Sequence, residues 1–169
     1  MTSPAVVWVL GSDSDLPHIQ DGLAALRELD ISFEVRILSA HRTPDAVDEL
    51  ARGARERGVR VLIGVAGGAA HLPGVLAART TLPVIGVPIP TDLAGGLDSL
   101  LSIVQMPAGI PVAAVAAGKS GGRNAALLAA SILSVADGRV AAALDAGRRS
   151  MADKVLARDR EKGVRVQGG

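Results

Sequence analysis

The sequence has no cysteine, and its only aromatic residues are Trp8 and Phe33. The lack of cysteine excludes disulfides, thiolate nucleophiles and thiolate metal ligands. No long run of one charge sign occurs, and 18 basic and 17 acidic side chains give a net charge of +1, which argues against a nucleic acid or membrane partner. No apolar run approaches the roughly 20 residues of a membrane span, and the first, 5–10, is too short for a signal peptide. We therefore expect a cytoplasmic protein.

Apolar residues make up 49% of the 169-residue chain, so one domain can bury a core built from alanine, valine, leucine and isoleucine. We predict a single domain over residues 1–169. Its core spans about 5–137, an oligomerisation helix spans about 138–160, and a loose tail covers 163–169. We find no internal repeat or interdomain linker.

Short β-branched runs alternate with longer segments of helical periodicity, which is typical of α/β proteins. Continuous apolar strands, such as 61–65, indicate burial on both faces and therefore a parallel sheet covered by helices. We predict a three-layer αβα sandwich with the flavodoxin-like strand order 2-1-3-4-5. The predicted strands are 5–10, 32–38, 60–65, 83–87 and 110–116, and the predicted helices are 16–29, 44–57, 72–80, 97–105 and 123–136.

The helix after Gly138 carries an apolar stripe at helical spacing, interrupted by Gly147. Either this stripe packs on its own domain or, as we favour, it docks on a neighbouring subunit. The stripe consists of Val140, Ala143, Leu144, Met151 and Val155.

Three unusual loops, 11–15, 39–44 and 66–74, follow the first three strands. Ligands of open parallel sheets bind at the carboxyl ends of the strands, so this strand order brings all three loops to one pocket. In the first loop, the hydroxyls of Ser12 and Ser14 suit a phosphate, and Asp15 suits ribose hydroxyls. Asp15 is equally well explained as the N-cap of the next helix, where Pro17 occupies the first turn.

In the second loop, Thr43 before Pro44 is most simply a helix N-cap. Arg42 offers a planar fork to a phosphate. His41 changes charge near neutral pH and can both donate and accept a proton. In the third loop, Gly67 and Gly68 allow a substrate to approach backbone amides closely.

Other candidate sites are weaker. The histidine spacings match no metal motif, and 118–120 fails as a phosphate loop because Ala113 stands where that motif needs glycine. The segment 91–96 after the fourth strand is either a lid or an ordinary turn.

The strings GSDSD, SAHRTP, AGGAAHLPG, PVIGVP, SIVQMPAGIPV and NAALLAA, in this order, resemble the PurE family of purine biosynthesis, over about residues 6–133. The N5-carboxyaminoimidazole ribonucleotide mutase branch is the closer match. The resemblance implies conversion of that ribonucleotide into 4-carboxyaminoimidazole ribonucleotide by a homo-octamer that needs no metal or ATP.

By position, the resemblance makes His41 the catalytic histidine. It assigns substrate contacts to Ser12, Ser14, Asp15, Ser39 and Arg42, and it places Gly67, Gly68, Ala69, His71 and Leu72 around the imidazole and carboxylate. Asp13 and Ala108 depart from the family pattern, where lysine and arginine are frequent. Two rivals remain, namely an aminoimidazole ribonucleotide carboxylase that uses free CO2, and a flavodoxin-like nucleotide-binding module. The candidate loops contain no aromatic residue to stack on a flavin, which argues against the second.

Overall fold

The computed structural model describes residues 3–164. Its strands are β1 (Val6–Leu10), β2 (Phe33–Ile37), β3 (Val61–Ala66), β4 (Val84–Pro88) and β5 (Ala113–Ala114). Its helices are the short 3-10 helix η1 (Asp13–Asp15) followed by α1 (Leu16–Glu28), α2 (Pro44–Gly53), α3 (Leu72–Ala77), α4 (Leu97–Val104), α5 (Lys119–Ser134) and α6 (Gly138–Lys162).

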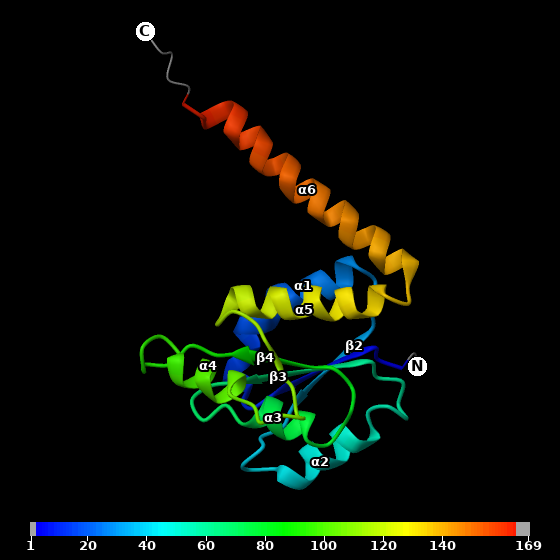
Figure 1. The fold of residues 1–169 in the computed structure, drawn as a ribbon, viewed down its shortest axis with the longest axis vertical. Coiled ribbons are helices and arrows are strands. Elements are labelled where there is room, and N and C mark those ends of the chain that lie inside the picture. Colours follow the sequence, from blue (N-terminus) through cyan, green and yellow to red (C-terminus); the bar gives the residue numbers. More distant parts are fainter. Residues whose placement is uncertain (1–2, 165–169) are drawn as a thin grey trace.

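The five strands form one parallel sheet in the order β2-β1-β3-β4-β5, which confirms the predicted fold class and strand order. Helices cover both faces of the sheet, with α1 and α5 on one side and α2 and α3 on the other (Figure 1). The order places the carboxyl ends of β1, β2 and β3 side by side, because β1 pairs with both of the other strands.

The alternation of side chains along β1 divides the core into two clusters. Val6, Trp8 and Leu10 face α1 and α5, whereas Val7 and Val9 face α2 and α3. All five side chains are fully buried, as expected for a central parallel strand covered on both faces.

Helices α1 and α5 pack closely at a point where each carries a glycine, Gly22 on α1 and Gly122 on α5. A Cβ atom added to Gly22 would lie 2.5 Å from the carbonyl oxygen of Gly122, and a Cβ at Gly122 would collide with the carbonyl of His18. This contact explains why α5 begins at Lys119 and not at the predicted Arg123. Glycine disfavours a helix, but here close packing against α1 outweighs that propensity.

The fifth strand is much shorter than the predicted 110–116. Pro111 has no N–H to donate to the ladder, and the N–H of Ile110 closes a turn onto Pro107, so pairing with β4 is confined to Ala113 and Ala114. The second helix is also shorter than predicted and ends at Gly53 instead of Arg57.

Helix α6 confirms the predicted C-terminal helix and extends away from the sheet (Figure 1). Val140 is buried, and Leu144 packs on the core cluster beside α1 and α5, whereas Met151 and Val155 are exposed. Within residues 3–164, none of the helices combines the length and apolarity needed to cross a bilayer. Most of the predicted tail, 163–169, lies outside the described residues.

Candidate active site

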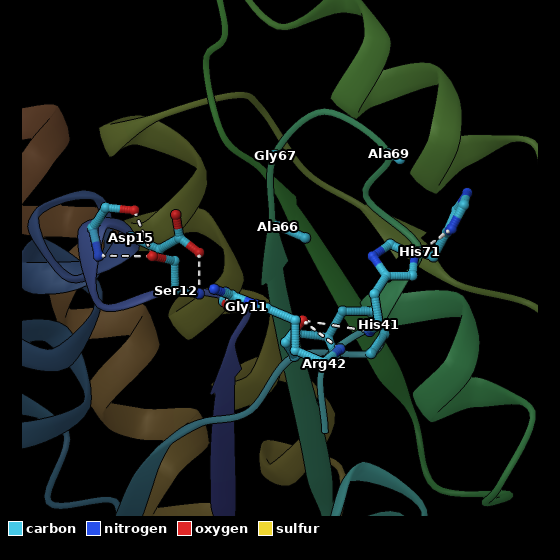
Figure 2. A pocket seen from close by; sticks show the side chains of 13 residues that line it. Gly11, Ser12, Asp15, His41, Arg42, Ala66, Gly67, Ala69 and His71 are labelled. Atoms are coloured by element: carbon cyan, nitrogen blue, oxygen red, sulfur yellow. Dashed lines mark hydrogen bonds between the residues drawn. The ribbon is translucent and has the colours of Figure 1, made fainter. Parts of the chain in front are cut away.

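A cavity of about 490 Å³ lies at the carboxyl ends of β1, β2 and β3 and joins the three loops predicted to form the site (Figure 2). All the predicted site residues except Gly68 line it, and Gly11, Ala40 and Ala66 complete the wall. The lining residues are Gly11, Ser12, Ser14, Asp15, Ser39, Ala40, His41, Arg42, Ala66, Gly67, Ala69, His71 and Leu72.

The first loop is held by reciprocal hydrogen bonds between Ser12 and the residues after it. The Ser12 Oγ accepts from the N–H of Ser14 at 3.3 Å, and the Asp15 Oδ2 accepts from the N–H of Ser12 at 3.1 Å. This capping box starts η1. Asp15 occupies the N-cap position of α1, with Pro17 in the first turn as predicted, but its side chain makes no capping hydrogen bond to that helix.

Asp15 is buried, with 7% of its surface exposed. Burial raises the pKa of its carboxyl, while the hydrogen bond from the Ser12 N–H and the nearby His18 act in the opposite direction. A carboxylate held at this energetic disadvantage beside a cavity is a candidate for binding a ligand.

The second loop is organised by Ser39 and Thr43. The Ser39 Oγ accepts from the N–H groups of His41 at 3.4 Å and Arg42 at 3.2 Å. Thr43 occupies the N-cap position of α2, which confirms the predicted helix start. Its hydroxyl does not cap the helix, because it donates to the Ser39 carbonyl at 3.1 Å and accepts from the Ser39 N–H at 2.9 Å and so closes the loop. Arg42 donates through Nη2 to the Gly11 carbonyl at 2.8 Å, which directs its guanidinium to the first loop.

His41 and His71 form a hydrogen-bonded pair across the cavity (Figure 2). The Nε2 of His41 lies 2.8 Å from the Nδ1 of His71, and the rings meet edge to face at 81°. Only one proton fits between these two nitrogens, so one ring donates and the other accepts. The Nδ1 of His41 is not part of this hydrogen bond.

The third loop exposes backbone at Gly67 and Ala69. Among the described residues, neither N–H donates to a protein acceptor, so both are available to a ligand. The N–H of Gly68 is not available, because it donates to the Ser99 Oγ at 2.9 Å. Gly68, which we predicted to contact the substrate, is not among the residues that line the cavity.

Two comparisons of sequence identify the family. The model of the AIR carboxylase family matches residues 5–154. The chain belongs to this family. An N5-carboxyaminoimidazole ribonucleotide mutase of Mycobacterium tuberculosis is 56% identical over 158 residues, which are 94% of this chain and 90% of that protein. A mutase of the same description from Bacillus subtilis is 52% identical over 153 residues, which are 90% and 94% of the two chains.

The solved structures agree with this assignment to the AIR carboxylase family. The crystal structure of Treponema denticola PurE matches the fold with a TM-score of 0.86 at 31% identity, covering 95% of this chain and 99% of that one. Membership of the family confirms the resemblance that the loop motifs indicated, and the matched region contains all three loops of the cavity.

Sequence reasoning missed Ser99 and Ser102, which contact the third loop from α4. Ser99 and Ser102 lie three residues apart in α4 and therefore share one helix face, but this spacing by itself does not point to the third loop. The rejected phosphate motif at 118–120 forms the start of α5 and does not line the cavity.

Proposed function

We propose that the protein is an isomerase of de novo purine biosynthesis that converts N5-carboxyaminoimidazole ribonucleotide into 4-carboxyaminoimidazole ribonucleotide, with His41 as acid and base. The observation that carries this proposal is the position of His41. It shares one cavity with the serines and the arginine that suit a ribonucleotide phosphate. The close sequence similarity to mutases from two bacteria supports the choice of reaction.

The first two loops would hold the ribonucleotide. The hydroxyls of Ser12 and Ser14 and the guanidinium of Arg42 suit the phosphate, since toward the described residues Arg42 uses one of its five donor hydrogens, on the Gly11 carbonyl. Asp15 suits the ribose hydroxyls because, within residues 3–164, no backbone N–H donates to its Oδ1. The imidazole and its carboxyl group then lie toward the third loop and the two histidines.

The reaction needs two proton transfers. Protonated His41 donates to N5 of the carbamate, the N–C bond breaks, and CO2 and aminoimidazole ribonucleotide form in the cavity. C4 of the imidazole then attacks CO2, and neutral His41 removes the proton from C4 to restore the aromatic ring. One histidine performs both transfers and ends as it began, which fits a reaction with no net gain or loss of protons. General acid–base catalysis of this kind contributes about 10²- to 10⁴-fold to a rate.

His71 would determine which nitrogen of His41 reacts. If the Nε2–H of His41 donates to the Nδ1 of His71, the Nδ1 of His41 is the atom that gives and takes the proton. The free N–H groups of Gly67 and Ala69 lie on the same wall and suit the carboxylate or CO2.

A carboxylase that uses free CO2 is the second candidate, and an assay with two substrates separates them. We expect rapid turnover of N5-carboxyaminoimidazole ribonucleotide and little turnover of aminoimidazole ribonucleotide with bicarbonate. Efficient carboxylation of aminoimidazole ribonucleotide together with no reaction of the carbamate would overturn the mutase assignment.

A homo-octamer is the assembly that we propose. The number eight rests on the resemblance to the PurE family, and the apolar surface left exposed on one chain supports association. Leu97, Leu101 and Val104 follow each other on α4 and are each about half exposed, while Met151 and Val155 are exposed on α6. His41 and His71 are exposed as well, so a neighbouring copy beside the third loop would help to exclude water from the reaction. Native mass spectrometry should give an octameric mass, and a lone 17.1 kDa species at micromolar concentration would contradict this.

A further inference from the structure

Asp15 and Ser99 are the two buried polar side chains within residues 3–164. Asp15 lines the cavity, whereas Ser99 lies behind its wall on α4 and has no exposed surface. A buried hydroxyl is unfavourable unless it is hydrogen-bonded. The Ser99 hydroxyl acts both as a donor and as an acceptor: it donates to the Ile89 carbonyl at 2.7 Å and accepts from the Gly68 N–H at 2.9 Å.

Hydrogen bonds hold both backbone polar groups of Gly68, its N–H and its carbonyl. Its backbone has a φ of 67°, a conformation that side chains disfavour. Its carbonyl accepts from the Ala70 N–H at 2.8 Å and from the Ser102 hydroxyl at 3.3 Å. Helix α4 thus holds the N–H and the carbonyl of one glycine through two serines on a single face.

The residues beside Gly68 form the wall of the active site. Gly67 and Ala69 line the cavity. The N–H of His71 donates to the Ala69 carbonyl at 2.7 Å, and the ring of His71 contacts His41 at 2.8 Å. A continuous path of hydrogen bonds and covalent neighbours therefore runs from Ser99 to the proposed acid–base group.

The same hydroxyl joins this wall to the segment after β4. Ile89, whose carbonyl accepts from Ser99, packs against Gly67 together with Thr91. Thr91 in turn donates to the Asp98 Oδ1 at 2.6 Å at the start of α4. Segment 89–98 and the third loop are thus attached to one helix and to each other.

We propose that Ser99 is a positioning residue for the carboxyl transfer, whose hydroxyl holds Gly68 so that the Gly67–Ala69 wall retains CO2 and His71 keeps His41 oriented. This inference rests on the proposed function. Without the hydroxyl, the Gly68 N–H and the Ile89 carbonyl lose their shared partner, and the wall can move away from the substrate. More CO2 then escapes before C4 captures it, and free aminoimidazole ribonucleotide accumulates.

The test compares Ser99→Ala with Ser131→Ala, because Ser131 lies on α5 and its hydroxyl donates to the Leu127 carbonyl, far along the chain from the cavity wall. The ratio of aminoimidazole ribonucleotide released to 4-carboxyaminoimidazole ribonucleotide formed should rise at least fivefold in Ser99→Ala and stay at the wild-type value in Ser131→Ala. Product affinity should change less than threefold, since the first two loops hold the ribonucleotide. A wild-type release ratio in Ser99→Ala would overturn the inference.

Two further measurements cover other outcomes. Hydrogen exchange of the 67–71 backbone, followed by mass spectrometry, should accelerate in Ser99→Ala while that of β1 does not. Unchanged exchange would overturn the positioning role without reference to activity.

If Ser99→Ala does not fold, Ser102→Ala removes only the 3.3 Å bond and should raise the release ratio in the same direction. If the proposed function itself is wrong, the wild-type protein will not convert N5-carboxyaminoimidazole ribonucleotide. If only the inference about Ser99 is wrong, the wild-type protein will convert it and the variants will behave like wild type.

Discussion

Replacing Asp15 by asparagine tests whether the Asp15 carboxylate binds the ligand or serves only the structure of its loop. Asparagine has the same shape and keeps an oxygen that can accept from the Ser12 N–H, so the capping box survives. The change removes the charge that burial disfavours. We therefore expect folding and substrate binding to respond in opposite directions.

The expected effect on stability follows from the raised pKa of Asp15. In the folded protein the charged carboxylate is less favourable than in the unfolded chain, so it lowers stability at neutral pH. That cost disappears as the pH falls below the raised pKa of Asp15 toward the unfolded value of about 3.9. The asparagine variant should thus have an equal or larger free energy of unfolding at pH 7, and its gain over wild type should shrink in acid.

The expected effect on binding is a loss. A hydrogen bond to a charged group contributes about 1.5–3 kcal/mol, against about 1 kcal/mol for a neutral one. Losing the charge therefore costs about 0.5–2 kcal/mol, which corresponds to a rise of about 2- to 30-fold in KM for the ribonucleotide.

Urea unfolding and steady-state kinetics measure the two effects, with Asp21→Asn as the control. Asp21 is exposed on α1, so this variant changes the net charge equally without touching the cavity. An Asp15→Asn protein that is clearly less stable than wild type, yet binds substrate normally, would show that Asp15 is structural and refute the reasoning.

The remaining predictions concern the histidines, the arginine and the helix packing. His41→Asn should abolish turnover while calorimetry still detects product binding, and near-normal activity would refute the acid–base role. His71→Asn should lower kcat about 5- to 10-fold with little change in product affinity, as expected for loss of one orienting hydrogen bond, whereas a wild-type kcat would contradict its effect on His41. Arg42→Ala should raise KM much more than it lowers kcat, and a defect in kcat alone would exclude a phosphate anchor. Gly22→Ala places a methyl group against the Gly122 carbonyl, so we expect the free energy of unfolding to fall by about 1–3 kcal/mol and Tm by about 3–10 °C. An unchanged melting curve would mean that α1 and α5 can move apart without a loss of stability.

The sequence alone determined that the sheet is parallel and which loops follow its first three strands, and the order of the strands is the one expected from the flavodoxin-like class. Strands such as β1 and β3 are apolar throughout because both faces are buried, and this pattern is visible without coordinates. The order β2-β1-β3 then requires the loops after these strands to meet, so His41, Arg42 and the serines could be assigned to one cavity from their place in the chain.

Only the tertiary structure decided how the side chains in those loops are used. Asp15 and Thr43 stand where helix N-caps stand, but their oxygens bond within their own loops, since the capping preference is a local rule and the turn geometry offers closer partners. The role of Ser99 depends on a contact with Gly68 across 31 positions of sequence, which no local pattern encodes. Long-range hydrogen bonds of this kind form only after the strands have brought α4 beside the third loop, so the chain's periodicity predicts the helix and leaves its polar partners undetermined.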